Sequence, residues 1–418
     1  MKKNSTRYNQ QVSDDQQHLD DTKRHALIIG ASSVLTKLAD LLSSSKIVLI
    51  WSFASVGAPA GLLALFAPTR ESLSMLPQIF LSNYIKQRQY RKGFWVGGSI
   101  AQSLCIAGMI FILMNMEGIR AGLFGYGLLI AFSLSRAVCS LTMKDILGKT
   151  VAKDWRGRVT GNATSISSFL AVLFALVLYF AGQRTDLSYL LFLAMAVLAW
   201  LLASILFSYI DEPATDIKPS KNEEKPSLIP AFKLLKNDQN FRHFIIARGL
   251  LICSAIIPVF IVIEMHQQDT DLRQLAVLLI VSSLGSTVSS RLWGSLADRS
   301  ARLAIFYGAL ITGIVCFFLI WVSMLNIVGD WLFLIALFFA MIGHSGIRVG
   351  RKTYVVNVAK DNKRTDYVAV SNTLIGCLLL LAGGLISVFA AFSVTYVFML
   401  LAVMAAAGAY VCSQLQEA

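Results

Sequence analysis

Residues 294–302 read Gly-Ser-Leu-Ala-Asp-Arg-Ser-Ala-Arg and separate two long apolar stretches. The stretches cover about residues 275–293 and 303–325, and each is long enough to cross a bilayer as a helix. Arg299 and Arg302 stand in the polar segment between them. Because basic residues are enriched in the cytoplasmic loops of membrane proteins, we expect two membrane helices joined by a short cytoplasmic loop.

The same alternation runs through the chain and predicts an all-α integral membrane protein with twelve transmembrane helices. Of the 418 residues, 56% are hydrophobic and only 15% are charged, whereas an ordinary soluble domain has about 25% charged residues. The first two expected spans, about 27–53 and 58–81, carry the most charges, and a pair of interfacial helices is the alternative for the first. Pro59, Pro68 and Pro77 would kink the second. The other spans cover about residues 94–114, 121–143, 159–181, 187–210, 244–265, 275–293, 303–325, 331–350, 368–390 and 395–413.

The net charge of +13 comes from 37 Lys and Arg against 24 Asp and Glu. A basic chain raises nucleic acid as a partner, but here the basic residues gather in alternate loops, among them Arg351 and Lys352. Only Arg120, Arg184 and Arg273 fall in the other set of loops. This asymmetry predicts cytoplasmic termini in a plasma (inner) membrane protein, without a nucleic-acid partner.

Polar segments divide the chain into two six-helix halves. We expect a disordered cytoplasmic tail over 1–24, a bundle over 25–210, a cytoplasmic linker over 211–243, a second bundle over 244–414 and a short tail over 415–418. The end of the linker, residues 228–240, could form an interfacial helix. The tetrapeptide at 151–154, Val-Ala-Lys-Asp, recurs at 358–361 after the fourth span of each half, which indicates duplication.

The segment 294–302 resembles the G-x-L-A-D-R-x-G-R loop of the major facilitator superfamily, which lies between the second and third spans of each half. Ala301 replaces the second glycine, and the corresponding first-half loop, residues 81–92, keeps only its basic end. Gly294 would allow close helix packing, and Arg299 and Arg302 would pair with carboxylates or helix carbonyls. The resemblance implies that Asp298 contacts the start of the fifth span, near residues 158–160, when the cytoplasmic side is closed. A solvated loop that only enforces topology is the alternative.

Charged residues within the spans mark the candidate site, because a buried charge must be paired or hydrated. Arg136 resembles an arginine that many family members carry in the fourth span, and the resemblance implies that spans one, four, seven and ten line a central cavity. Lys37 and Asp40 lie three residues apart and could pair, while Arg70 and Glu71 point in different directions. The candidates are Lys37, Asp40, Arg70, Glu71, Arg136, Arg248 and His344. Arg136 and Arg248 could instead anchor helices, and His344 could be a packing residue.

These features predict a secondary transporter that moves a small polar solute by alternating access. Basic candidates outnumber acidic ones, so an anionic or zwitterionic solute is expected. We expect proton coupling through Asp40 or Glu71, with facilitated transport left open, and a monomer surrounded by lipid. The six cysteines lack metal-ligand spacing and no set of catalytic residues converges, so neither a cofactor, a metal nor an enzyme activity is expected. A lipid or amphiphile transporter, a drug exporter and a non-transporting receptor or scaffold are the alternatives.

Overall fold

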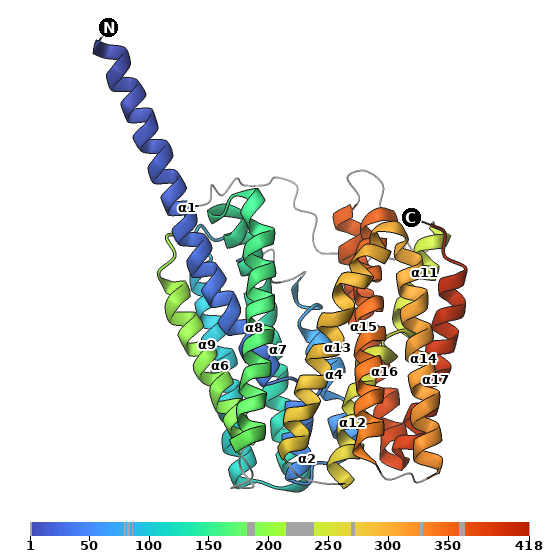
Figure 1. Ribbon diagram of the computed structural model, residues 1–418. Helices are drawn as coiled ribbons and strands as arrows, with labels where there is room; N and C mark the ends of the chain where they lie inside the picture. The colour runs from blue at the N-terminus through green and yellow to red at the C-terminus, as the bar shows by residue number, and fades with distance from the viewer. Residues whose placement is uncertain are drawn as a thin grey trace.

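The computed structural model describes residues 2–78, 81, 84–85, 87–181, 189–214, 238–268, 272–325, 329–358 and 364–417. In these ranges the regular structure is helical throughout (Figure 1). The first half comprises α1 (Lys2–Leu42), α2 (Val48–Ser55), α3 (Ala60–Leu63), α4 (Phe66–Leu73), α6 (Lys92–Asn115), α7 (Gly118–Thr150), α8 (Lys153–Ala181) and α9 (Tyr189–Ser208). The second half comprises α11 (Gln239–Leu250), α12 (Cys253–Gln268), α13 (Leu272–Arg299), α14 (Ala301–Met324), α15 (Asp330–Val358), α16 (Arg364–Phe392) and α17 (Val394–Ser413).

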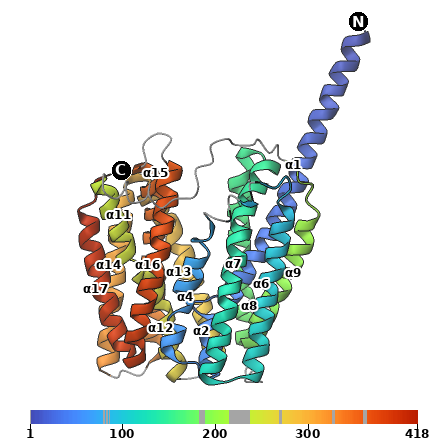
Figure 2. The same cartoon turned by 180° about the vertical axis from the view of Figure 1, so that it is seen from behind.

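Two bundles of roughly parallel helices stand side by side (Figures 1 and 2). Among the described residues, eleven helical segments are long and apolar enough to cross a membrane. Large apolar side chains such as Leu292, Phe392 and Tyr410 are exposed on these helices. An apolar exterior suits a lipid environment, where the backbone must satisfy its own hydrogen bonds. The expectation of an all-α integral membrane protein is confirmed.

The second expected span is not one helix. Residues 58–81 contain two short helices, α3 and α4, separated by a turn at Ala64 and Leu65. Pro59 immediately precedes α3, and another turn ends with Pro77. Proline lacks the amide hydrogen that a continuing helix needs, so three prolines in one span interrupt it instead of only kinking it. The kink expected in this segment is therefore a full interruption into two short helices.

The first expected span also breaks. Helix α1 ends at Leu42, a turn follows, and α2 starts at Val48. Ser43 donates a hydrogen bond to the carbonyl of Ala39 (2.8 Å), and Ser44 accepts one from the amide of Lys46 (3.4 Å). Serine side chains compete in this way with the helical backbone pattern. The consecutive serines therefore explain why the helix ends inside the expected span.

The seventh span, which begins the second half, has a similar interruption. Helix α11 ends at Leu250, just after Gly249, and α12 begins at Cys253. The first span of each half is thus discontinuous. In transporters built from two related halves, interrupted helices at corresponding positions mark the binding region, because a broken helix exposes backbone and polar groups inside the bundle.

The N-terminal residues are helical where we expected disorder. Helix α1 starts at Lys2 and continues without a break into the first span, projecting beyond the bundle in Figure 1. Neither glycine nor proline occurs before Gly30, so no residue in this stretch interrupts the helix. The expected interfacial helix at 228–240 lies almost entirely outside the described residues.

The two halves contact each other away from the face that carries the termini, which we call the terminal face (Figure 1). On the opposite side, Ser55 at the end of α2 and His266 in α12 are joined by a 2.9 Å hydrogen bond. Ser387 in α16 donates a hydrogen bond of 2.6 Å to the carbonyl of Gly61 in α3. Deeper in the bundle, Ser72 donates one of 2.7 Å to the carbonyl of Gly376. These contacts join the halves through α2, α3 and α4.

Glu212 fastens the start of the linker to the first bundle at the terminal face. Its side chain is only 1% exposed and accepts hydrogen bonds of 2.7 Å from the backbone amides of Arg91 and Lys92. Lys149 lies 3.1 Å from the same carboxylate and 2.6 Å from Asp145. Arg91 also pairs with Asp145. Glu212, expected at the start of a flexible linker, therefore belongs structurally to the first bundle.

Replacing Glu212 with alanine is expected to destabilise the protein by about 3 kcal/mol, because it leaves buried donors without their acceptor. The measurement is the midpoint of thermal unfolding in detergent. Asp211→Ala is the matched control, since Asp211 pairs with Arg24 at an exposed position (3.3 Å, 74% and 57% exposed) and such pairs contribute less than about 1 kcal/mol. Equal midpoints for the two variants would contradict this assignment.

Candidate functional site

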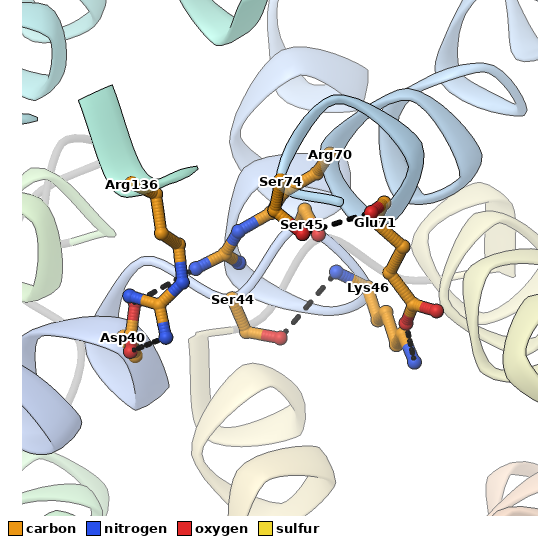
Figure 3. A pocket seen from close by; sticks show the side chains of 8 residues that line it. All are labelled: Asp40, Ser44, Ser45, Lys46, Arg70, Glu71, Ser74 and Arg136. Atoms are coloured by element: carbon orange, nitrogen blue, oxygen red, sulfur yellow. Dashed lines mark hydrogen bonds and ion pairs between the residues drawn. The ribbon is translucent and has the colours of Figure 1, made fainter. Parts of the chain in front are cut away.

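Two adjoining cavities lie where the interrupted helices face α7, α15 and α16. The smaller, of about 240 Å³, contains the residues drawn in Figure 3: Asp40, Ser44, Ser45, Lys46, Arg70, Glu71, Ser74 and Arg136. The larger, of about 620 Å³, is lined by Ser74, Met75, Gln78, Arg136, Ser140, Lys144, Arg248, Arg351, Lys352, Val355 and Asn372. Ser74 and Arg136 belong to both walls. A volume of this size suits a small organic molecule.

Asp40 is the centre of an ion-pair cluster in the smaller cavity (Figure 3). Arg70 from α4 lies 2.9 Å from one carboxylate oxygen, and Arg136 from α7 reaches both oxygens at 2.6 and 2.5 Å. The Arg70 guanidinium also lies 5.1 Å from the centre of the Phe132 ring, a cation–π contact. Asp40 is 16% exposed and Arg136 is 35% exposed, so Arg136 is the more accessible partner.

The expected pair of Lys37 with Asp40 does not form. Lys37 donates a hydrogen bond of 3.0 Å to the carbonyl of Thr160 and another to the Thr164 hydroxyl, both on α8. Two guanidinium groups occupy Asp40 instead, and a bidentate arginine is a stronger partner than a single ammonium group. Lys37 therefore joins α1 to α8 and does not line either cavity.

Glu71 forms the second ion pair of the smaller cavity. Its carboxylate lies 2.7 Å from the ammonium group of Lys46, which sits in the turn between α1 and α2. Arg70 and Glu71 thus point to different partners, as adjacent helical residues do, and as we expected. Lys46 was missed as a site residue, although a lysine after three serines in an apolar stretch could have been taken as the sign of an interrupted helix.

The larger cavity receives basic side chains from both halves. Arg136 and Lys144 come from α7, Arg248 from α11, and Arg351 and Lys352 from α15. We expected Arg351 and Lys352 in a cytoplasmic loop, but α15 continues to Val358 and places them on the cavity wall. The apolar residues Tyr354 and Val355, both buried, extend the helical pattern past Gly350 and could have indicated the longer helix.

Arg248 is buried, at 8% exposure, and reaches across to α16. It donates hydrogen bonds to the hydroxyl of Ser371 and to the side-chain carbonyl of Asn372, the latter at 3.1 Å. Its Nε atom is buried without a described hydrogen-bond partner. An arginine held in this way does not extend to the membrane surface, so the alternative of a snorkelling anchor does not describe its position.

His344 does not line either cavity. It is buried on α15, and its Nδ1 atom lies 3.1 Å from the hydroxyl of Ser254 on α12. This contact agrees with the alternative interpretation of His344 as a packing residue that joins two helices.

The segment 294–302 is almost entirely helical. Helix α13 continues to Arg299 and α14 begins at Ala301, so Ser300 alone separates them, and its hydroxyl accepts a 3.2 Å hydrogen bond from the amide of Leu303. Nothing lies within 4 Å of where a side chain on Gly294 would start, so the expected close packing is absent here. Arg302 pairs with Glu417 at 2.9 Å and donates to the carbonyl of Leu415 at 3.3 Å.

Asp298 and Arg299 are exposed. Within the described part of the chain, no ion pair or hydrogen bond joins either side chain to residues 158–160. The implied contact between Asp298 and the fifth span is therefore not formed in this conformation.

The family comparison concerns mainly the second half. Residues 249–414 match the family model described as Major Facilitator Superfamily. Comparison with curated protein sequences finds no significant match.

Solved transporter structures share the fold over nearly the whole chain. The nucleoside transporter NupG has 9% identity and a TM-score of 0.69, covering 94% of this chain and 98% of its own. A D-xylose-proton symporter has 13% identity and a TM-score of 0.69 over 94% and 98%. A POT family transporter in complex with a thioalcohol-conjugated peptide has 11% identity and a TM-score of 0.68 over 93% and 95%. At these identities the likeness establishes the fold and does not indicate a solute.

The two-bundle fold and the eleven candidate spans define an all-helical integral membrane protein with a polar cavity inside it. Its second half matches the family model and its whole length shares the fold. The second half of the chain is thus similar to the major facilitator superfamily, and nearly the whole chain has the fold of the solved transporters compared with it.

Proposed function

We propose that this protein carries a small anionic organic solute across the membrane by alternating access, with the two cavities as its binding site. The observation that supports the proposal is the charge of the cavity wall. Its described cations are Lys46, Arg70, Arg136, Lys144, Arg248, Arg351 and Lys352, and its described acids are Asp40 and Glu71. This excess of positive charge inside a membrane protein favours an anion, because uncompensated charges are costly there.

The conformation supports alternating access. Contacts such as Ser55 with His266 and Gly61 with Ser387 join the halves on the side opposite the terminal face. Asp298, in contrast, is exposed and forms no ion pair or hydrogen bond with the described part of the fifth span. With the basic loops and both termini placed in the cytoplasm of the inner membrane, this arrangement is the inward-facing state.

Proton coupling is a second part of the proposal. Asp40 and Glu71 are the carboxylates on the described cavity wall, and each contacts a cation that also faces the cavity. Protonation of Asp40 would remove the charge that holds Arg136, and the freed guanidinium could then bind a substrate anion. Proton binding and anion binding would therefore favour the same rearrangement.

Uptake into proteoliposomes tests this function. With the purified protein reconstituted and radiolabelled organic anions outside, we expect saturable uptake that an inward proton gradient stimulates. If uptake by the native protein does not depend on the proton gradient, the proposed proton coupling is wrong. The Asp40→Asn variant should lose the stimulation of uptake by the gradient. Binding without any flux would favour the receptor alternative, and movement of labelled phospholipid in place of anions would favour the lipid alternative.

A further inference from the structure

We infer that the ligand of the larger cavity carries at least two negative charges, as a phosphate monoester or a di- or tricarboxylate does. This inference rests on the proposed function and adds the charge class of the solute. The argument depends on which cavity cations already have a carboxylate partner and which do not.

The smaller cavity is nearly neutral. Lys46 is paired with Glu71, while Arg70 and Arg136 share the single carboxylate of Asp40. The cluster around Asp40 thus keeps one positive charge in excess, and its accessible member is Arg136. The remaining lining groups, Ser44, Ser45 and Ser74, offer hydroxyls, which suit the uncharged polar part of an organic molecule.

The larger cavity is not neutralised by described residues. Four of its cations have no carboxylate oxygen within 4.0 Å in the described part of the chain: Lys144, Arg248, Arg351 and Lys352. They come from α7, α11 and α15, so they surround the cavity from both halves. With the excess charge at Arg136, the two walls carry five more positive than negative charges.

One negative charge would leave most of this excess in place. Like charges repel strongly in a low-dielectric wall, and each added negative charge on the ligand therefore contributes attraction to several cations at once. A guanidinium group pairs through two hydrogen bonds with carboxylate and phosphate alike, so both kinds of anion suit Arg351. The buried Nε of Arg248, which has no described hydrogen-bond partner, is a further donor beside the cavity.

Neutral donors complete the site. The side-chain carbonyl of Asn372 accepts a hydrogen bond from Arg248, and this bond orients the Asn372 amide beside the cavity. Gln78, which follows the turn after α4, also lines the cavity. The described wall of the larger cavity bears no carboxylate, and most of its described side chains carry a hydrogen-bond donor. We therefore place the charged group in the larger cavity and the hydroxyl-bearing part next to the serines.

Binding to the purified full-length protein in detergent tests this charge class without requiring transport. The probes are acetate, succinate, citrate, inorganic phosphate and glycerol 3-phosphate at constant ionic strength. We expect at least one multivalent probe to bind about tenfold or more tightly than acetate, and its affinity to fall as salt is added. The affinities of inorganic phosphate and glycerol 3-phosphate show whether a phosphate group alone is enough or an organic part is needed. The affinities of succinate and citrate show whether two or three carboxylates bind best. Equal affinity for acetate and all other probes would overturn the inference.

Variants locate the site. Arg351→Gln and Lys352→Gln should each weaken the multivalent ligand by about tenfold, while Lys352→Arg should retain binding, because it keeps the charge. Arg120→Gln, an exposed cation on the opposite side, is the matched control and should bind as the native protein does. Unchanged binding in both glutamine variants would overturn the inference. If a multivalent anion binds but is not transported, the inference about the charge of the ligand still holds. Only the proposed transport function is then contradicted.

Discussion

Replacing Arg136 with alanine is expected to reduce transport by at least about 30-fold, the equivalent of about 2 kcal/mol, because the change removes a charged hydrogen-bonding partner from a mostly buried carboxylate. Arg136 is the cation common to both cavities, and it holds both oxygens of Asp40. The measurement is initial uptake in proteoliposomes, normalised to the amount of folded protein.

Two further variants separate function from folding. Arg136→Lys keeps the charge but not the bidentate geometry, so partial activity is expected. Arg136→Gln leaves Asp40 paired with Arg70 and should keep thermal stability without keeping transport. Normal uptake in Arg136→Ala, or in Arg136→Gln, would exclude Arg136 from the transport site.

A disulfide between positions 61 and 387 is expected to stop transport in proportion to the fraction of molecules that are cross-linked. A Cβ atom at Gly61 would lie 3.6 Å from the Ser387 Oγ and 3.1 Å from the Ser387 carbonyl oxygen, so the two positions adjoin and a disulfide would need a small backbone adjustment. The bond would hold α3 against α16 on the side opposite the terminal face, so the halves could not separate there. Alternating access requires that separation.

The experiment uses Gly61→Cys with Ser387→Cys in a Cys377→Ser background, because Cys377 is exposed whereas the other native cysteines are buried. Oxidation should abolish uptake and a reducing agent should restore it, while each single cysteine variant should be insensitive to both. Undiminished uptake in fully cross-linked protein would show that this interface does not open during transport.

The fold could be predicted from the sequence because membrane spans leave a strong signal. Long apolar stretches, one-sided basic loops and the segment 294–302 were enough to predict an all-α membrane protein with the major facilitator fold, and the comparisons confirm it. Helix interruptions were harder to predict. The serines at 43–45 and the prolines of the second span break helices inside the membrane, and an apolar average over 20 residues hides such local competition for hydrogen bonds.

The candidate site was predicted in part. Asp40, Arg70, Glu71, Arg136 and Arg248 do gather at the cavities, because charged side chains inside spans need partners or water. The ion-pair partner of Asp40 was not predictable from the sequence. Lys37 on its own helix and arginines on two other helices can all pair with it, and only the packing of the helices decides which of them come close. Arg351 and Lys352 were assigned to a loop because a basic pair at the end of an apolar stretch also fits the positive-inside rule.

Counterflow in proteoliposomes tests the central claim most directly, namely that this protein moves an anion through the cavity beside Arg136. Liposomes are loaded with the tightest-binding multivalent anion from the binding panel, and trace radiolabelled anion is added outside. We predict a transient accumulation of label that Arg136→Ala abolishes and that oxidation of the 61–387 cysteine pair blocks reversibly. A protein that binds the anion with native affinity yet shows no counterflow would contradict the account.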